Sequence, residues 1–290
     1  MMRRIFIALL AMLPLVAVSQ RVQKVAIAGS YCPRVVIVDK ASGAIEWSYE
    51  LTQEGSECNS VSVTKKGDVL ISYKLGAQLI GRDGHVIWDY HRQNDKQEVQ
   101  TAVPIKGGFM LGICGTPMKI VELSMDGKVT KELSYDLGVS DSHGQFRRMF
   151  KTKDGSYIVP LIGGASVLEL SASGQKVNQF EVGGSPFAGS ELKDGSLLIS
   201  CGNRVAEFTR AGDFIRDIAG AIVGCDTMRF LTEAVRLDNG NTMVTNWQGH
   251  ADNSNGAQII ELDEQGKVVW LFDNKKQLKY VSAVFPFMSK

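Results

Sequence analysis

The chain alternates short runs of apolar and polar residues with glycine-containing turns. Near the C-terminus, residues 242–245, 258–263 and 267–272 form three such runs, with Gly240 and Gly266 in the turns before the first and the last. Side chains along a β-strand point alternately to opposite faces, and Asn-Gly sequences favour tight hairpin turns. This stretch therefore predicts consecutive β-hairpins.

The same pattern recurs along the whole chain. Its first turn glycine recurs every 40 to 47 residues, at Gly67, Gly108, Gly155, Gly195 and Gly240. Each repeat holds four short predicted strands, and this period with four strands per repeat is typical of propeller blades. A single four-stranded blade cannot bury both of its faces, so the blades must stack around a central channel.

The two ends of the chain supply a sixth blade. Residues 25–29 predict one strand, residues 35–47 predict two more, and residues 280–287 predict the missing one. Pairing the C-terminal strand with the N-terminal three closes the ring without a free edge. We therefore predict an all-β fold, a six-bladed β-propeller of four-stranded antiparallel blades that forms a single domain over residues 20–290.

Residues 1–19 differ from the repeats. Arg3 and Arg4 precede an apolar core of 14 residues, and small residues follow at 17–19. This pattern predicts a secretory signal peptide, because the core is shorter than the roughly 20 residues of a membrane-spanning helix. An uncleaved anchor is the alternative. We expect an exported protein, periplasmic or extracellular, with no integral membrane segment after cleavage.

The charge balance is nearly even. The chain has 32 basic and 31 acidic residues, and removal of Arg3 and Arg4 leaves 30 basic ones. Nucleic-acid-binding surfaces need an excess of positive charge, so this balance predicts no nucleic-acid partner. The hydrophobic fraction of 44% and the charged fraction of 22% are ordinary for a globular protein and argue against disorder.

Asp39, Gly43 and Trp47 form a motif that resembles the tryptophan-docking motif of quinoprotein-like propellers, within the WD40/YVTN-like superfamily. Trp88 and Trp270 end shorter versions of it. A large ring at the end of an outer strand fills the wedge between neighbouring blades. Quinoprotein dehydrogenases are similar in motif but have eight blades, adjacent disulfide-bonded cysteines and a metal site. This chain has six repeats and no adjacent cysteines, so we expect no cofactor.

Residues 237–250 are also similar to secreted bacterial propellers and, more distantly, to arylsulfotransferase-type propellers. A single repeat cannot transfer a catalytic residue. The resemblance therefore implies the fold and export, and it assigns no catalytic residue.

One face of the predicted propeller collects the longer polar loops. They join second to third strands and one blade to the next, whereas the opposite face has short hairpins such as 65–67, 153–155 and 193–195. Functional residues concentrate on loops over a rigid scaffold, so we place binding on this loop face. The candidate binding residues are Asn59, Gln100, Cys114, His143, Arg147, Asn246, Trp247 and His250.

Two kinds of position stand out among these candidates. One polar or aromatic residue per blade stands eight residues before each turn glycine: Asn59, Gln100, Arg147, Phe187 and Thr232. Such a ring either coordinates a ligand or lines a hydrated channel. Trp247 and His250 lie in the longest loop, where an aromatic ring beside polar groups suits a sugar or aromatic ligand. The alternative is a tryptophan packed against its own loop.

All five cysteines fall on the loop face. Cys32 and Cys58 occupy two loops of one blade and Cys201 and Cys225 the same two loops of another, with separations of 26 and 24 residues. In an exported chain this repeated placement predicts two disulfides. Buried free thiols and a metal or reactive site are the alternatives. Cys114 has only His143 in the matching loop, a weak signal, and we expect no metal site.

The leading hypothesis is an exported, non-catalytic propeller that binds a glycan, peptide or protein partner through its loop face. The alternative is a propeller enzyme of the lyase, hydrolase or sulfotransferase type. In that case His143 or His250 would act as general base, and Arg147 or Arg229 would hold an anion. A purely structural protein would have no converging polar groups at the channel mouth.

Overall fold

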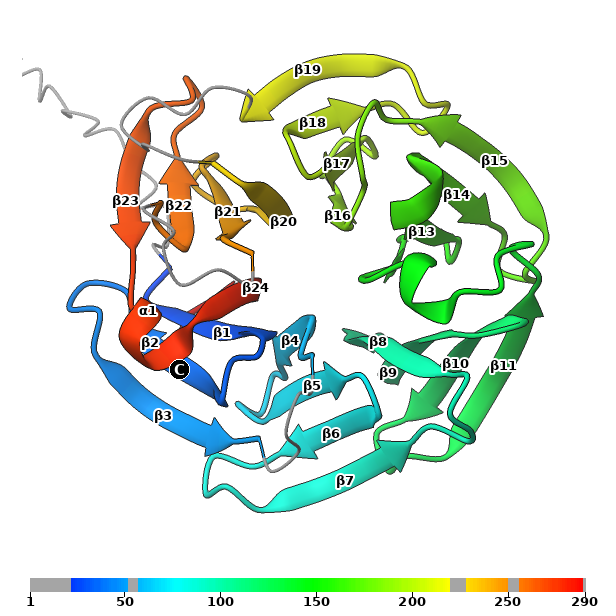
Figure 1. Cartoon of the computed structure of the whole chain (residues 1–290), viewed down its shortest axis with the longest axis horizontal. Coiled ribbons are helices and arrows are strands. Elements are labelled where there is room, and N and C mark those ends of the chain that lie inside the picture. Colours follow the sequence, from blue (N-terminus) through cyan, green and yellow to red (C-terminus); the bar gives the residue numbers. More distant parts are fainter. Residues whose placement is uncertain (1–21, 52–56, 220–227, 250–255, 289–290) are drawn as a thin grey trace, which may run out of the picture.

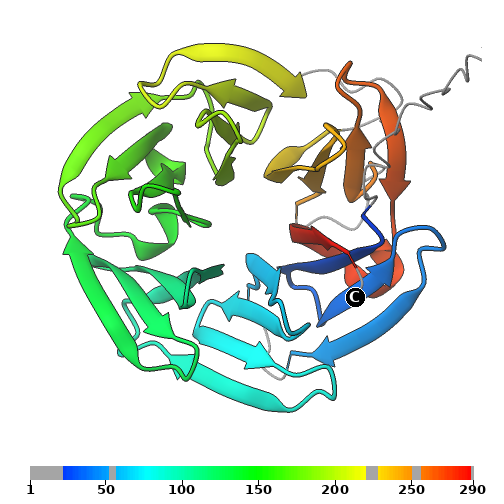
Figure 2. The same ribbon diagram turned by 180° about the vertical axis from the view of Figure 1, so that it is seen from behind.

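The computed structural model of the chain describes residues 22–51, 57–219, 228–249 and 256–288. In this part of the chain, six four-stranded antiparallel sheets stand as blades around a central axis (Figures 1 and 2). The predicted six-bladed β-propeller is confirmed. The segment predicted as a signal peptide lies outside the described residues.

The blades run from an innermost strand near the axis to an outermost strand at the rim (Figure 1). The closing blade consists of β24 (Tyr280–Phe287), β1 (Lys24–Ser30), β2 (Arg34–Asp39) and β3 (Ile45–Glu50). The next blade consists of β4 (Ser60–Val63), β5 (Val69–Tyr73), β6 (Gly76–Ile80) and β7 (Val86–His91). The third consists of β8 (Glu98–Ile105), β9 (Gly108–Cys114), β10 (Met118–Ser124) and β11 (Val129–Tyr135).

The other three blades follow the same order. The fourth consists of β12 (Phe150–Lys151), β13 (Tyr157–Leu161), β14 (Ser166–Leu170) and β15 (Lys176–Glu181). The fifth consists of β16 (Ala188–Glu191), β17 (Leu197–Ser200), β18 (Val205–Phe208) and β19 (Phe214–Ala219). The sixth consists of β20 (Phe230–Arg236), β21 (Thr242–Trp247), β22 (Ile259–Leu262) and β23 (Val268–Phe272).

The ring closes through the pairing of the two chain ends. Strand β24 runs antiparallel to β1 from Lys24 opposite Phe287 to Ser30 opposite Tyr280, with a bulge at Gly29. A Cβ atom at Gly29 would lie 1.9 Å from the carbonyl oxygen of Tyr280, so only glycine fits this approach. The predicted closure by the C-terminal strand is therefore present.

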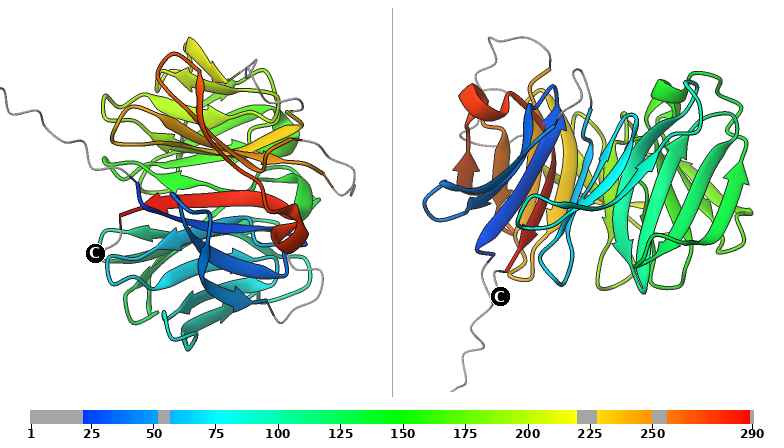
Figure 3. Two further views of the ribbon diagram at one scale, coloured as in Figure 1. Left: turned by 90° about the vertical axis from the view of Figure 1, so that its left-hand side faces the viewer. Right: turned by 90° about the horizontal axis from the view of Figure 1, so that it is seen from below.

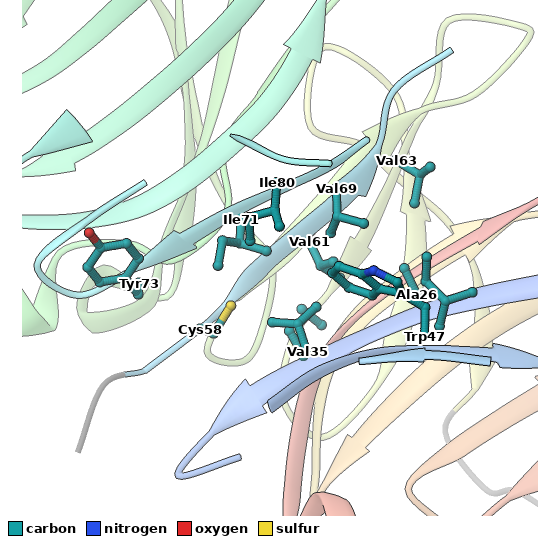
Figure 4. Close-up of a cluster of buried hydrophobic side chains, with 13 residues drawn as sticks. Ala26, Val35, Trp47, Cys58, Val61, Val63, Val69, Ile71, Tyr73 and Ile80 are labelled. Atoms are coloured by element: carbon teal, nitrogen blue, oxygen red, sulfur yellow. The ribbon is translucent and has the colours of Figure 1, made fainter. Parts of the chain in front are cut away.

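The core lies between the blades. The middle strands β5 and β9 are buried on both faces, whereas the outermost strands alternate between half-buried and exposed positions. Figure 4 shows one such interface, where Trp47 of β3 packs among apolar side chains of the neighbouring blade. Its indole Nε1 donates to the carbonyl of Arg82 at 3.0 Å, and Trp270 donates likewise to Lys40 at 3.0 Å. The two indoles dock on a turn of the next blade, and Trp47 packs in the wedge between neighbouring blades.

Four blade interfaces also contain a buried ion pair that the sequence analysis does not anticipate. The third strands of four blades carry a buried glutamate at the equivalent position: Glu122, Glu169, Glu207 and Glu261. Each pairs with a cation of the following blade, in order Lys151, Arg210, Arg236 and Lys40. The charges are therefore compensated where the blades exclude water.

A further ion pair crosses the channel itself. Arg148, just before β12, pairs with Glu233 of β20, and its Nη2 lies 3.4 Å from Ser62 Oγ of β4. Glu233 Oε2 also accepts from the backbone amide of Val284 in β24 at 2.8 Å. Burial lowers the pKa of Arg148 to about 10. Three side chains and one backbone amide, from four innermost regions, thus meet around this buried ion pair.

The two faces of the disc differ. The short helices η1 (Ser142–Gly144), η2 (Ile162–Gly164) and α1 (Lys275–Leu278) lie on the loop face, and the C-terminal end of β24 lies on the other (Figure 3). Within the described ranges, no helix has the length and apolar character needed to cross a bilayer.

Candidate functional site

A cavity of about 230 Å³ opens where the channel meets the loop face. We call it the axial pocket. Its polar lining is Ser30, Glu57, Asn59, His143, Arg147 and Ser282, and its apolar lining is Ile162, Phe187, Phe230 and Trp247. Pockets for drug-sized ligands occupy roughly 300–1,000 Å³, so the axial pocket suits a single small ring.

The apolar wall is a row of aromatic rings. Phe230 packs edge-to-face against Phe187 on one side and Trp247 on the other, each with ring centroids 6.1 Å apart. Trp247 Nε1 donates to Ser30 Oγ of the closing blade at 3.0 Å. The indole therefore bridges two blades at the pocket instead of packing only against its own loop.

The polar wall centres on His143. Its Nδ1 lies 3.0 Å from Glu98 Oε2, and its Nε2 lies 2.9 Å from Arg147 Nη2. A guanidinium can only donate, so Nε2 must accept, and the ring proton sits on Nδ1 and is donated to Glu98. Arg147 is further held by the carbonyls of His143 and Phe146, at 2.5 and 3.1 Å.

Glu98 is buried beneath the imidazole and stays charged. Burial opposes its ionisation most strongly, but hydrogen bonds from His143, Lys74 and Gln100 outweigh it and hold the pKa of Glu98 at about 2. Lys74 Nζ lies 3.0 Å from Glu98 Oε1, and Gln100 Nε2 donates to Oε2 at 2.9 Å. The carboxylate fixes the orientation of His143.

Glu57 contributes an acceptor to the pocket. Its Oε2 is buried and has no hydrogen-bond partner among the described residues, and it lies 3.8 Å from His143 Nδ1, whose proton goes to Glu98. A buried carboxylate oxygen without a donor is costly. A ligand hydroxyl or amide in the pocket would supply that donor.

The predicted polar ring is only partly at the pocket surface. Asn59, Arg147 and Phe187 line the pocket, whereas Gln100 lies behind it and accepts from Asn59 Nδ2 at 3.1 Å. Thr232 is buried against Thr245, with their hydroxyl oxygens 2.8 Å apart. The ring therefore both lines the pocket and supports it from behind.

Other candidates lie elsewhere. Asn246 is buried and ties loops together, accepting from the amide of Arg229 at 2.9 Å and donating to Ala257 at 3.1 Å. The exposed Arg229 side chain lies over Gly249 and does not line the axial pocket. His250 lies outside the described residues. The structure thus brings together Asn59, His143, Arg147 and Trp247 from the predicted set.

The described cysteines are buried free thiols. Cys32 and Cys58, predicted to form a disulfide, are separate here, and each thiol donates to the carbonyl two residues further on, at the start of the following strand, in Arg34 and Ser60. Cys201 is also free, and its predicted partner Cys225 lies outside the described residues. Burial raises the pKa of Cys32 to about 11, which makes this thiol unreactive at neutral pH.

Cys114 and His143 do not form a pair. The Cys114 thiol lies 3.5 Å from the carbonyl of Phe146, and burial raises its pKa to about 12. In the part of the chain that the structure describes, no three His, Cys, Asp or Glu side chains are placed to hold a metal ion.

Sequence reasoning missed Ser30, Glu57, Glu98, Ile162, Phe230 and Ser282. Ser282 is the sixth member of the polar ring, at the start of β24, and its hydroxyl donates to Asn59 Oδ1 at 2.7 Å. Counting back from a turn glycine could not identify Ser282, because the two inner strands of the closing blade come from opposite ends of the chain and no hairpin turn joins them. The strand alignment of β24 with the other innermost strands was the available signal.

The fold has solved relatives. A protein of unknown function from Bacteroides caccae is 32% identical, with a TM-score of 0.86 over 93% of this chain and 100% of its own. A catalytically inactive variant of virginiamycin B lyase from Staphylococcus aureus, solved with quinupristin, is 15% identical (TM-score 0.61; 88% and 82% of the chains). The WD40 propeller domain of Doa1 is 14% identical (TM-score 0.55; 77% and 71%). The last two share the fold alone.

No curated protein matches the sequence. These structures agree with the predicted propeller fold, and the quinoprotein-like resemblance stays a prediction. The model of the Mal s 1 allergenic protein-like family matches residues 27–267, which is most of the propeller. The chain is therefore a member of the Mal s 1 allergenic protein-like family.

Proposed function

We propose that this chain is an exported, non-catalytic binding propeller that holds one neutral sugar ring in the axial pocket. The observation that carries the proposal is the pairing of an aromatic wall with an arginine and a carboxylate oxygen that has no partner in the described part of the chain, across a cavity of about 230 Å³. Export is inferred from the sequence pattern of residues 1–19.

The two walls match the two kinds of surface on a pyranose. The C–H face of the ring is apolar and packs on aromatic rings such as Trp247 and Phe230, while the hydroxyls at the ring edge need donors and acceptors. Glu57 Oε2 accepts. Among the described residues, Arg147 uses three of its five N–H groups, which leaves two for ligand oxygens.

Charge favours a neutral ligand. Glu57 and Glu98 are balanced by Arg147 and by Lys74, which lies 3.0 Å from Glu98. A strongly acidic or basic ligand would leave one of these charges uncompensated in a largely buried site. Neutral hydroxyls satisfy the open groups without changing the net charge.

The arrangement also favours binding over catalysis. A general base needs a lone pair within reach of the substrate proton. The Nε2 lone pair of His143 already accepts from Arg147, and Nδ1 donates to Glu98, so both ring nitrogens are engaged. His143 therefore positions Arg147 in this structure.

Calorimetric titration with methyl glycosides of glucose, galactose, mannose, xylose and N-acetylglucosamine tests the proposal. At least one should bind, and Trp247→Ala and Glu57→Gln should each weaken that binding at least tenfold, about 1.4 kcal/mol. Phe214→Ala and Glu132→Gln are matched controls on outer strands and should bind normally. No binding by any glycoside to the folded protein would overturn the proposal.

An enzyme of the lyase, hydrolase or sulfotransferase type is the second candidate. It is favoured by the Glu98–His143 hydrogen bond of 3.0 Å, which fixes the tautomer that leaves Nε2 basic once Arg147 turns to a substrate. Aryl glycosides and aryl sulfates should then be turned over, and His143→Gln should abolish turnover. Binding without turnover of these compounds favours the first proposal.

A further inference from the structure

The axial pocket is not the only cavity that His143 lines. A groove of about 640 Å³ runs between residues 94–98, in the β7–β8 loop and the first residue of β8, and residues 140–143, before and in η1, with Thr116 at its side. We call it the polar groove. The axial pocket and the polar groove share His143, whose side chain is 44% exposed.

We propose that the pocket and the groove form one site for an unbranched neutral oligosaccharide, with its terminal sugar in the axial pocket and the following units along the groove. This inference rests on the proposed function. A cavity that holds a single ring explains recognition of one end, and the adjoining groove of nearly three times the volume holds the units that follow.

The lining of the groove fits a sugar chain. All ten lining residues are polar or charged, and they offer amide, hydroxyl and carboxylate groups but no large apolar side chain. A peptide or protein partner is recognised mainly through buried aromatic and apolar anchors, which the groove does not provide. A chain of hydroxyl-rich rings uses the groups that are present.

The groove is also held in shape before any ligand binds. Arg92 donates to the carbonyls of Asp95 and Gln97, each at 3.2 Å, which fixes one wall. Gln145 fixes the other, because its amide bonds to Gly115 and Val139 at 2.8 Å. The Ser142 hydroxyl donates to the carbonyl of Lys96 and joins the two walls. A preformed groove loses little entropy on binding.

Each wall offers a position at which the groove can be blocked without touching the axial pocket. Ser140 and Lys96 are exposed groove residues on opposite walls, and neither lines the axial pocket. Ser140→Trp and Lys96→Trp would fill the groove from either side. Lys193→Trp, on an exposed hairpin of the opposite face, is the matched control.

The experiment compares methyl glycosides with the matching linear tetrasaccharides by calorimetry on the full mature chain. The tetrasaccharide should bind at least tenfold more tightly than the methyl glycoside. Ser140→Trp and Lys96→Trp should each remove that gain and leave methyl glycoside affinity unchanged, and Lys193→Trp should change neither. The second blocking variant covers the case in which the first does not fold.

The outcomes separate this inference from the proposed function. If the methyl glycoside binds and the tetrasaccharide gains nothing, or if the gain survives both blocking variants, the extended site is wrong and the single-ring pocket stands. If neither compound binds, both proposals are overturned.

Discussion

Replacement of Glu233 by glutamine tests the ion pair that crosses the channel. In the structure the carboxylate of Glu233 compensates the buried guanidinium of Arg148, whose side chain is 11% exposed. Glutamine keeps the shape and one acceptor oxygen but removes the charge. Loss of one partner from a buried ion pair costs about 3–5 kcal/mol, because the other charge is left uncompensated. Since glutamine can still accept from Val284, we expect the lower end, about 3 kcal/mol.

The assay is urea and thermal unfolding followed by tryptophan fluorescence. For a domain of this size, about 3 kcal/mol corresponds to a fall in Tm of roughly 6–12 °C. Asp238→Asn is the matched control, because the Lys193–Asp238 pair is 88% and 80% exposed and should contribute less than about 0.5 kcal/mol. The double variant Arg148→Met, Glu233→Leu removes both charges and should recover most of the stability. A Glu233→Gln protein that melts within 2 °C of the parent would refute the reasoning.

Three further predictions concern the site and the ring. Glu98, with a folded pKa of about 2 against an ordinary 4.5, contributes stability above pH 4.5 that is lost as the pH falls to 2. This difference in pKa corresponds to at most about 3 kcal/mol. The free energy of unfolding of Glu98→Gln should therefore fall less between pH 4.5 and pH 2 than that of the parent protein. Trp270→Phe removes the hydrogen bond to Lys40 and should lower the free energy of unfolding in urea by about 1 kcal/mol. An unchanged free energy of unfolding would contradict the docking role of Trp270. Gly29→Ala should lower the free energy of unfolding by about 3 kcal/mol, because its Cβ would clash with the carbonyl of Tyr280. A variant as stable as the parent protein would show instead that β24 moves to make room.

The blades could be predicted because their signal is local. Alternation along each strand and a glycine in each turn depend on neighbouring residues only, and Gly67 and Gly155 show this with φ angles of 95° and 94°. Closure by β24 followed because residues 280–287 were the one strand left for an incomplete blade. Patterns among neighbouring residues therefore carry most of the information needed to predict this fold.

The site could be predicted only in part, because it depends on which loops meet. Position in the repeat led to Asn59, Arg147 and Phe187, and the length of its loop led to Trp247; all four line one pocket. Glu57 and Glu98 have no repeat counterpart that marks them, and their role comes from their contact with His143.

The cysteine prediction shows the same limit. Equal spacing indicated equivalent loops, but it could not show that the thiols of Cys32 and Cys58 turn toward the carbonyls at the start of the strands that follow them. Side-chain direction within a loop depends on tertiary contacts, which the spacing of residues does not contain.

A crystal structure of the protein soaked with its best-binding methyl glycoside tests the central claim most directly. We predict a sugar ring in the axial pocket, with its C–H face on Trp247 and Phe230 and hydroxyls within hydrogen-bond distance of Glu57 and Arg147. A sugar bound elsewhere on the propeller, with the axial pocket holding only water, would contradict the account.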